Sequence, residues 1–355
     1  MLYALILAGG KGTRLYPLSR SKKPKQFLKV VNNKSFLRIT VDRIKPLVSS
    51  ENIYIVTNKE YKSKIYEELP EIKEENIFIE PQNRDTAICI GLSAIKFLKK
   101  DNDACMIVLP SDHFIEGEKD FIDTINEGIE ISQRRRGLVT IGVNPSRAET
   151  GYGYIKMGRR VNSVISAYKV ERFVEKPNLE VAKDLIAKGD YLWNSGMFIW
   201  RADVYLREME KYLPKIYKSM MKIYENLGTE SEDKTIKNEY ECMEGISVDF
   251  GIMQKTRKAY VIKCNFRWDD IGSFKALSRF LNKNQTNNVS GNNYLKDSEN
   301  CCIFGEDKLI IGLGLKDLVV VDGGDILLIM DKNKDQELKH LVSEIKGDDD
   351  LKRYI

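Results

Sequence analysis

A glycine-rich, cationic segment is the part of the chain whose residue types most directly indicate chemistry. The sequence LILAGGKGTRLYPLSRSKKPKQF covers residues 5–27 and starts with an apolar run. Glycines let backbone amides approach a phosphate chain, and nearby cations neutralise its charge; here these residues are Gly9, Gly10 and Gly12 with Lys11, Arg14 and Lys25. The third glycine of a Rossmann fingerprint is replaced by Leu15, and the GK[ST] of a P-loop is absent. The segment therefore predicts a phosphate-binding loop of another kind.

The elements that position this loop follow from the hydrophobic periodicity of the first two-thirds of the chain. Apolar runs predict strands at 3–8, 52–57, 76–80, 104–110 and 138–143, and segments of helical period predict helices at 35–47, 59–69, 84–99 and 120–134. This alternation is typical of an α/β fold, with βα units on a mostly parallel sheet flanked by helices. Ligands bind at the carboxyl edge of such sheets. We therefore expect the chemistry to follow Ala8, Glu80 and Pro110.

The second half of the chain predicts a different organisation. Residues 150–200 have β character around a helix at 178–188, and residues 202–240 have helical character. An Asn-, Ser- and Gly-rich stretch at 282–300 predicts a linker with turns. Three or four short β runs follow, compatible with coils of a β-helix, and then a helical tail at 333–346. We expect a catalytic domain over 1–282 and a small β domain over 283–355.

Composition limits the partners and the compartment. The 355 residues carry 57 Lys and Arg against 52 Asp and Glu, an excess too small to predict a nucleic-acid or membrane surface. No apolar run is long enough to cross a bilayer, and the first residues lack the basic start of a signal peptide. The six cysteines include no CxxC pair, which indicates reduced, mostly buried thiols. The expected location is cytoplasmic.

Seven motifs occur in the order and approximate spacing of one enzyme family. They are LILAGGKGTRLYPLSR, PKQ at 24–26, PSDH at 110–113, GYGYI at 151–155, FVEKP at 173–177, WNSGMF at 193–198 and WDDIG at 268–272. Together they resemble the sugar-1-phosphate nucleotidylyltransferases, and most of all the bacterial mannose-1-phosphate guanylyltransferases. The resemblance implies a Rossmann-like sheet, a small C-terminal left-handed β-helix-like domain, and magnesium. It also implies the conversion of GTP and mannose 1-phosphate into GDP-mannose and pyrophosphate.

The resemblance implies four catalytic residues, Arg14, Lys25, Asp112 and Asp270. The two cations would hold the leaving phosphates, and the two aspartates would hold the metal, because Mg²⁺ usually takes one or two protein carboxylates together with phosphates and water. The family pattern WxDxG selects Asp270 over Asp269. Each aspartate could instead cap a helix or turn.

Nucleotide contacts are implied at Ala8, Gly9, Gly10, Gly12, Thr13, Glu80, Arg84, Asp85 and Ser111. The segment EPQNRDTA at 80–87 resembles the base-reading loop of the family. Guanine presents adjacent N1 and N2 donors, which a carboxylate can accept as a pair, so Glu80 or Asp85 could read the base. Many relatives have Asn where Asp85 stands.

Sugar-phosphate contacts are implied at Tyr152, Gly153, Glu175, Lys176, Asn194 and Asp249. Glu175 can accept from sugar hydroxyls, Lys176 can pair with the phosphate, and the amide of Asn194 can both donate and accept. Structural roles are the alternative: a core aromatic for Tyr152, a surface ion pair for Glu175 and Lys176, and a turn residue for Asn194.

Two other functions compete with this interpretation. One is a sister nucleotidylyltransferase acting on glucose 1-phosphate or a heptose 1-phosphate. The other is a catalytically silent subunit that senses sugar nucleotides, although a sensor has no need to keep both metal carboxylates. With only two histidines in the chain, the metal site of an added isomerase domain is not expected, so we predict a monofunctional enzyme. The apolar β domain could pair with a second copy as a homodimer.

Overall fold

The computed structural model describes the chain except for residues 11, 32, 162–164, 282–286, 306–307 and 336. The chain forms two compact units. The large unit comprises 1–9, 40–111 and 115–268, and the small unit comprises 10–39, 112–114 and 269–355. The domain boundary predicted at 282–283 falls on residues outside the described part.

A nine-stranded sheet organises the large unit, in the order β5-β4-β1-β6-β11-β8-β12-β10-β9. The strands are β1 (Leu2–Leu7), β4 (Ile53–Asn58), β5 (Ile77–Glu80), β6 (Cys105–Pro110), β8 (Leu138–Val143), β9 (Tyr154–Arg160), β10 (Ala167–Val174), β11 (Tyr191–Arg201) and β12 (Ala259–Lys263). Strands β5, β4, β1 and β6 pair in parallel, whereas β11 is antiparallel to both β6 and β8. Only β10 and β11 run against the common direction, which confirms the mostly parallel sheet.

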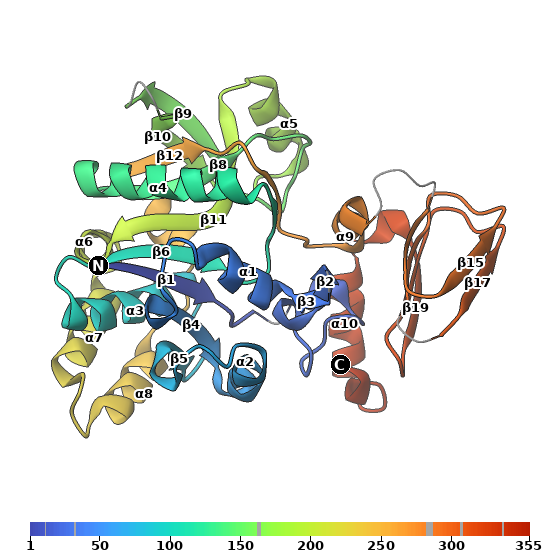
Figure 1. Cartoon of the computed structure of the whole chain (residues 1–355), viewed down its shortest axis with the longest axis horizontal. Helices are drawn as coiled ribbons and strands as arrows, with labels where there is room; N and C mark the ends of the chain where they lie inside the picture. Colours follow the sequence, from blue (N-terminus) through green and yellow to red (C-terminus); the bar gives the residue numbers. More distant parts are fainter. Residues whose placement is uncertain (11, 32, 162–164, 282–286, 306–307, 336) are drawn as a thin grey trace. The chain divides into compact units, whose positions relative to one another are not determined.

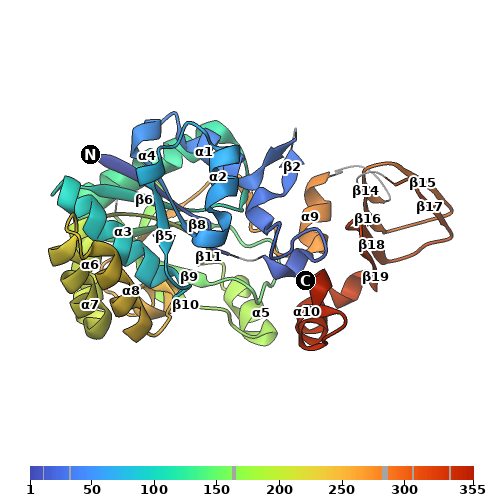
Figure 2. The same ribbon diagram turned by 90° about the horizontal axis from the view of Figure 1, so that it is seen from below.

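Helices cover both faces of this sheet (Figures 1 and 2). The helices from residue 36 to residue 242 are α1 (Phe36–Ile44), α2 (Lys62–Glu68), α3 (Thr86–Lys100), α4 (Glu118–Arg135), α5 (Leu179–Ala187), α6 (Ala202–Tyr212), α7 (Pro214–Asn226) and α8 (Glu232–Cys242). One core forms where α3, α6 and α7 pack on alternate strand residues such as Leu5, Val108 and Trp200. Helix α4 packs on the other face, where a Cβ on Gly128 would meet Ile199. Successive strand residues point to opposite faces, so the periodicity of the sequence was sufficient to predict these layers.

The small unit contains short parallel ladders typical of a β-helix. Its later strands are β14 (Asn288–Ser290), β15 (Asn293–Lys296), β16 (Cys302–Phe304), β17 (Ile310–Leu313), β18 (Leu318–Asp322) and β19 (Leu327–Asp331), with helices α9 (Phe274–Leu281) and α10 (Leu338–Gly347). Strand β14 pairs in parallel with β16, β16 with β18, and β15 with β17. Cys301, Ile303 and Val320 form one cluster of the unit, while Cys302 and Val319 belong to another.

The prediction of a linker over 282–300 was wrong for residues 288–290 and 293–296, which form β14 and β15. Asparagine is unfavourable in most strands, and the side chain of Asn287, which immediately precedes β14, joins neighbouring parts of the chain instead. Asn287 donates to the carbonyl of Ser298 at 2.7 Å and accepts from the amide of Cys301 at 2.9 Å. The polar composition therefore belongs to the rungs of the β-helix.

The glycine-rich segment contributes short elements to the small unit. They are η1 (Thr13–Leu15), η2 (Lys25–Phe27), β2 (Lys29–Val31) and β3 (Lys34–Ser35). Leu15 and Phe36 pack in one core with Phe274 and Cys302. The remaining elements are β7 (Phe114–Glu116), β13 (Arg267–Asp269), the π-helix η6 (Asp249–Met253), and the short helices η3 (Ser50–Asn52), η4 (Lys59–Tyr61), η5 (Glu74–Asn76), η7 (Lys332–Lys334) and η8 (Lys352–Tyr354).

Two further expectations concern the state of the cysteines and the presence of a membrane-spanning segment. All six thiols are free, and all except Cys242 are buried. Among the described residues, no helix has the length and apolar character needed to cross a membrane.

Gly291 provides a test of the β-helix. It has φ +89°, and a Cβ there would overlap the carbonyl oxygen of Gly305. We expect Gly291→Ala to lower the free energy of unfolding by about 2 kcal/mol or more, measured by urea denaturation. Gly314 also has positive φ, at +65°, but nothing described lies within 4 Å of its Cβ position. Gly314→Ala should therefore lose only about 1 kcal/mol. Equal losses from the two variants would contradict the proposed overlap.

Candidate active site

Lys25 is the centre of a polar cluster in the small unit. Its side chain is only 7% exposed, and its Nζ lies 2.9 Å from Oδ2 of Asp112. The same ammonium donates to the main-chain carbonyl of Asp270. Burial acts to raise the pKa of Asp112, but the charges of Lys25 and His113 outweigh it and hold that pKa below its usual range. Lys25 thus brings together two sequence-predicted carboxylate residues that are far apart in the chain.

Asp269 and Asp270 are neighbours with different environments. The carboxylate of Asp269 is buried, pairs with Arg279 at 2.7 Å, and accepts from the amide of Ile271 at 2.9 Å. Ile271 has φ +46°, a conformation that a β-branched residue rarely adopts. Asp269 therefore holds the strained backbone in place. Asp270 is partly exposed and accepts from the amide of Gly272 at 2.9 Å.

The glycines of the loop fall into two kinds. Gly12 has φ +59°, and a Cβ there would overlap Cβ of Lys25, so the packing requires glycine. In contrast, no described atom lies within 4 Å of a Cβ built on Gly10, and the nearest to Gly9 is Oε2 of Glu80 at 3.8 Å. The protein's own packing does not require glycine at these two positions. Glycine there leaves room for a ligand close to the backbone.

Arg14 lies beside this cluster. A Cβ built on Gly272 would lie 3.2 Å from Nη1 of Arg14 and 3.0 Å from Oδ2 of Asp270. Arg14, Lys25, Asp112 and Asp270 thus belong to one neighbourhood of the small unit. The side chain of Thr13 is outside the described residues.

Glu80 occupies an apolar position at the end of β5 in the large unit. It is 8% exposed, and its Oε1 accepts from the hydroxyl of Tyr240 at 3.3 Å. Burial raises its pKa to about 8; the Tyr240 hydrogen bond acts in the opposite direction, and Asp85 adds to the rise. Nearby, the amide of Ser111 donates to the carbonyl of Leu7, and the carbonyl of Ala8 accepts from Thr57.

Arg84 and Asp85 have structural partners. The guanidinium of Arg84 donates to the carbonyls of Tyr240 and Glu241, at 3.1 and 3.3 Å. Asp85 is the N-cap of α3 and accepts from the amide of Thr86 at 2.7 Å, with φ +67°. Asp and Asn tolerate positive φ better than most residues and also cap helices. Either Asp or Asn would therefore suit this position for structural reasons alone.

A second buried polar cluster lies in the large unit and unites several predicted sugar-phosphate residues. Asn194 Nδ2 donates to Asp249 at 2.8 Å, and Lys176 Nζ lies 2.5 Å from Oε1 of Glu175. Glu175 is 4% exposed, and its buried Oε2 has no hydrogen-bond partner among the described residues. A Cβ on Gly153 would overlap that same oxygen. The geometry thus leaves a buried acceptor directed to the Gly153 backbone.

Asp249 begins the π-helix η6, an element often found at functional sites. Burial and the charge of Glu175 raise the pKa of Asp249 to about 7, against the effects of Lys176 and Asn194. Tyr152 is a core aromatic, with ring centroids 5.2 Å from Trp193 and 5.1 Å from Trp268. These contacts are those of a core aromatic, and a sugar-phosphate contact of Tyr152 stays a prediction.

Comparison with known proteins places this geometry in a family. A profile of the family described as Nucleotidyl transferase matches residues 3–287. The chain belongs to that family. A second profile, for the MannoseP isomerase/GMP-like beta-helix domain, matches residues 291–345, in agreement with the β-helix-like ladders described above. Family members generally use a divalent metal.

Relatives of this nucleotidyl transferase cover nearly its whole length. A mannose-1-phosphate guanylyltransferase of Salmonella montevideo is 37% identical over 98% of this chain and 74% of its own, and one of Escherichia coli is also 37% identical. A crystal structure from Thermus thermophilus, described as a mannose-1-phosphate geranyltransferase, is 29% identical. It has a TM-score of 0.88 over 97% of this chain and 99% of that chain. A Helicobacter pylori protein described as a mannose-6-phosphate isomerase has a TM-score of 0.62 over 76% of this chain and 99% of that chain.

The donor set of the nucleotidyl transferase fits a hard divalent cation. Asp112 and Asp270 supply carboxylate oxygens, and both residues are linked to the same ammonium of Lys25. No group of three potential ligands occurs among the described residues. Two carboxylates suit an ion that takes its other ligands from phosphates and water.

Sequence reasoning did not find Tyr240 or Arg279. Tyr240 reaches Glu80 from a helix 160 residues away, and Arg279 pairs with Asp269 from α9. Neither residue lies in a motif. Only the fold reveals these partners.

The buried Asp249 predicts a pH-dependent stability. Its pKa of about 7 in the folded protein exceeds the ordinary 3.8. Below pH 4 the carboxyl is protonated in both the folded and the unfolded protein, so it does not lower the free energy of unfolding. As the pH rises from 4 to 7 the unfolded protein loses this proton first, and the free energy of unfolding falls. We expect Asp249→Asn to raise the free energy of unfolding at pH 8 by about 1–2 kcal/mol and to have little effect at pH 4. Urea denaturation at the two pH values measures the difference. If Asp249→Asn stabilised the protein equally at both pH values, the effect would not come from ionisation of the buried Asp249 carboxyl.

Proposed function

We infer that the chain is a mannose-1-phosphate guanylyltransferase, which converts GTP and mannose 1-phosphate into GDP-mannose and pyrophosphate. The observation that carries this function is the 37% identity to enzymes of that name over 98% of the chain. The cluster of Arg14, Lys25, Asp112 and Asp270 supports nucleotidyl transfer as the reaction type. It combines cations for phosphates with carboxylates for a metal.

The reaction is an in-line substitution at phosphorus. An oxygen of the sugar phosphate forms a bond to the α-phosphorus of GTP, while the bond from that phosphorus to the bridging oxygen breaks. The electron pair of the broken bond leaves with pyrophosphate. The attacking oxygen is already ionised, so no side chain needs to remove a proton. Positioning and electrostatic stabilisation therefore supply the catalysis.

The small-unit residues would hold the phosphates and the metal. Asp112 and Asp270 would bind Mg²⁺, which neutralises charge on phosphate oxygens when bound. Arg14 has a planar guanidinium suited to bidentate phosphate contacts, and Lys25 acts as a point charge. Because Asp112 already pairs with Lys25 at 2.9 Å, the ammonium is positioned before substrate arrives. The backbone of Gly10 and Gly12, with Thr13, would lie along the nucleotide. Ala8, Gly9 and Ser111 of the large unit are separately proposed as nucleotide contacts.

Glu80 is the proposed reader of guanine. Its carboxylate can accept from N1 and N2 of the base as a pair. Asp85 already caps α3, and Arg84 is anchored to main-chain carbonyls, so we assign both to shaping the loop around Glu80. The apolar position of Glu80 makes a correctly paired base more favourable than an unpaired one, because a buried carboxylate without donors is costly.

The sugar phosphate would bind at the cluster of Glu175 and Asn194. The buried Oε2 of Glu175 can accept from a sugar hydroxyl, and Lys176, with its side chain 51% exposed, can reach the phosphate. Asp249 orients the amide of Asn194 through their 2.8 Å hydrogen bond. Gly153 keeps the backbone close to the ligand, and Tyr152 supports this wall through its aromatic contacts.

The remaining assignments complete the proposal. Residues 1–282 would form the catalytic domain and 283–355 the β-helical domain. We place the enzyme in the cytoplasm, where its six free thiols stay reduced. Exposed apolar side chains on β15 and β17, Tyr294, Ile311 and Leu313, support association with a second copy as a homodimer.

Substrate selection is the first test. Purified protein with Mg²⁺ is assayed for pyrophosphate release from GTP, ATP, UTP and dTTP, each with mannose 1-phosphate or glucose 1-phosphate. We expect turnover largely confined to GTP with mannose 1-phosphate. Asp270→Asn should lower kcat by about 10²-fold or more, since it removes a carboxylate that would hold the Mg²⁺ needed to neutralise the phosphates.

The adjacent aspartate is the matched control for that variant. Asp269→Asn should lower the free energy of unfolding by about 1–3 kcal/mol through the loss of the Arg279 pair, while the folded protein keeps most of its turnover. Faster turnover with another substrate pair would change the assigned substrates but leave the proposed mechanism of nucleotidyl transfer unchanged. Substrate binding with no pyrophosphate release from any pair would favour the sensing subunit.

Base selection gives a separate prediction. We expect Glu80→Gln to lower kcat/KM for GTP by about 10–100-fold, the effect of losing one good base contact. Because the pKa of Glu80 is about 8, the KM for GTP in the native enzyme should fall between pH 6.5 and 8.5 as the carboxyl ionises. The variant should lack this pH dependence. Glu75→Gln, at an exposed carboxylate nearby, is the control, and the same loss in both variants would refute base reading by Glu80.

A further inference from the structure

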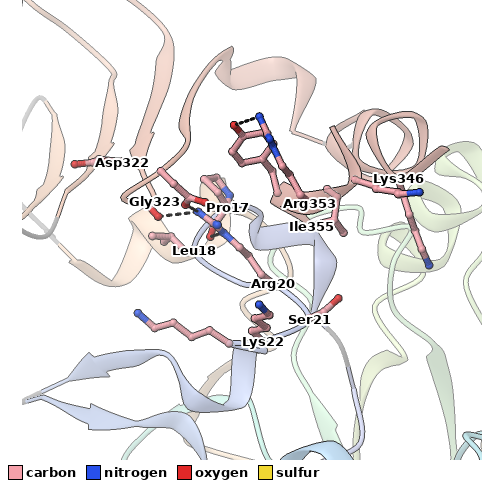
Figure 3. Close-up of a pocket in the computed structure, with 14 residues that line it drawn as sticks. Pro17, Leu18, Arg20, Ser21, Lys22, Asp322, Gly323, Lys346, Arg353 and Ile355 are labelled. Atoms are coloured by element: carbon pink, nitrogen blue, oxygen red, sulfur yellow. Dashed lines mark hydrogen bonds and ion pairs between the residues drawn. The ribbon is translucent and has the colours of Figure 1, made fainter. Parts of the chain in front are cut away.

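A basic pocket in the small unit is formed by residues that have no role in the proposed reaction (Figure 3). Its volume is about 890 Å³, within the range of roughly 300–1,000 Å³ typical of small-molecule sites. Three segments line it: 17–23, 322–325, and the C-terminal positions 346 and 352–355. The first of these segments precedes Lys25.

Positive charge dominates the lining. The cations are Arg20, Lys22, Lys23, Lys346, Lys352 and Arg353, and the side-chain carboxylates are Asp322 and Asp325. Both aspartates are already paired, Asp325 with Arg20 at 2.6 Å and Asp322 with Lys308 at 3.0 Å. The excess of cations favours an anionic ligand.

Two of these cations have unsatisfied charge. In the part of the chain that the structure describes, neither Lys346 nor Arg353 has an ion-pair partner. Arg353 lies over the ring of Tyr354, 4.8 Å from its centroid, and donates to its hydroxyl at 3.0 Å. A guanidinium has five N–H donors, so Arg353 retains the capacity for a two-pronged contact with phosphate.

Apolar side chains form the other walls of the pocket. Pro17, Leu18 and Tyr354 line it together with the cations. Inorganic phosphate would not use these walls or most of the volume. The combination fits an organic molecule that carries a phosphate group.

Hydrogen bonds and close packing connect the lining of the pocket to Lys25. Arg20 and Lys23 exchange two backbone hydrogen bonds of 3.0 Å, and the guanidinium of Arg20 donates to the carbonyl of Gly323 at 2.7 Å. A Cβ on Gly12 would lie 3.0 Å from Oγ of Ser19 and would overlap Lys25. Residues 19–25 are thus a tightly closed turn, with the pocket at one end and the Lys25 ammonium at the other.

We propose that this pocket binds a phosphorylated organic molecule as an effector, and that residues 19–25 transmit its binding to Lys25. The proposed binding site does not depend on the proposed function. The proposed effect on turnover does, because it assumes that the chain catalyses that reaction.

Isothermal calorimetry with adenosine 5′-monophosphate and with inorganic phosphate tests the site. We expect saturable binding of the nucleotide, tighter than that of phosphate, to the full chain. Lys346→Ala combined with Arg353→Ala should weaken it by about tenfold or more, because charge-assisted contacts are lost. Arg14→Ala, at an exposed cation of the proposed phosphate cluster, and the control Lys339→Ala, at an exposed α10 lysine outside the pocket, should both retain it. Unchanged affinity in the double variant, loss in Arg14→Ala, or equal weakening in Lys339→Ala would overturn the site, and equal affinity for phosphate would overturn the organic ligand.

Pyrophosphate release in the presence of saturating nucleotide tests the transmission. The native chain should change its kcat by about twofold or more, whereas the double variant should not respond. A native kcat unaffected by a nucleotide that calorimetry shows to bind would refute the effector role. If no substrate pair gives turnover, the proposed function fails, while the calorimetric result on the pocket stands.

Discussion

The buried ammonium of Lys25 is the interaction on which the small unit depends. That unit is made from three separate stretches of chain, and Lys25, Asp112 and Asp270 come one from each. A buried charge without partners is strongly unfavourable, so the ammonium requires the carboxylate of Asp112 and the carbonyl of Asp270. The same requirement that closes the unit also sets the positions of the two carboxylates. Architecture and chemistry therefore share one set of contacts.

Strain and rigidity near this ammonium follow the same logic. Gly12 lies against Lys25 in a conformation that requires glycine, and Ile271 holds a positive φ next to Asp270. Such conformations persist only where surrounding contacts over-determine them. Asp269 supplies one of those contacts through the amide of Ile271. Backbone in unusual conformations thus lies next to the groups that the proposed reaction uses.

The βα units of the first 143 residues could be predicted because strand and helix periodicities are local properties of the sequence. The antiparallel strand β11 between β6 and β8 could not, since the order of strands in a sheet depends on non-local pairing. Strands β14 and β15 were missed for a related reason. Their backbones pair in parallel with β16 and β17, and no propensity scale contains that non-local pairing.

The site shows the same division. The family pattern selected Asp270 over Asp269 as the proposed metal ligand, and the pair between Asp269 and Arg279 is consistent with that choice. Partners that come from distant elements were not visible, such as Tyr240 for Glu80. Arg20 is a further example: in the sequence it belongs to a run of cations typical of a solvated face, yet it bonds to Gly323 and Asp325.

The discontinuity of the small unit also has a consequence for the order in which the protein is made. Leu15 and Phe36 belong to a core completed by Phe274 and Cys302. At ribosomal rates the later residues emerge on the order of ten seconds or more after the earlier ones. During that interval the glycine-rich segment lacks its packing partners, and Lys25 and Asp112 lack the third stretch of the unit. Lys25, Asp112 and Asp270 are therefore brought together only after the stretch from residue 269 onward has been made, so we expect a nascent chain to be inactive until then.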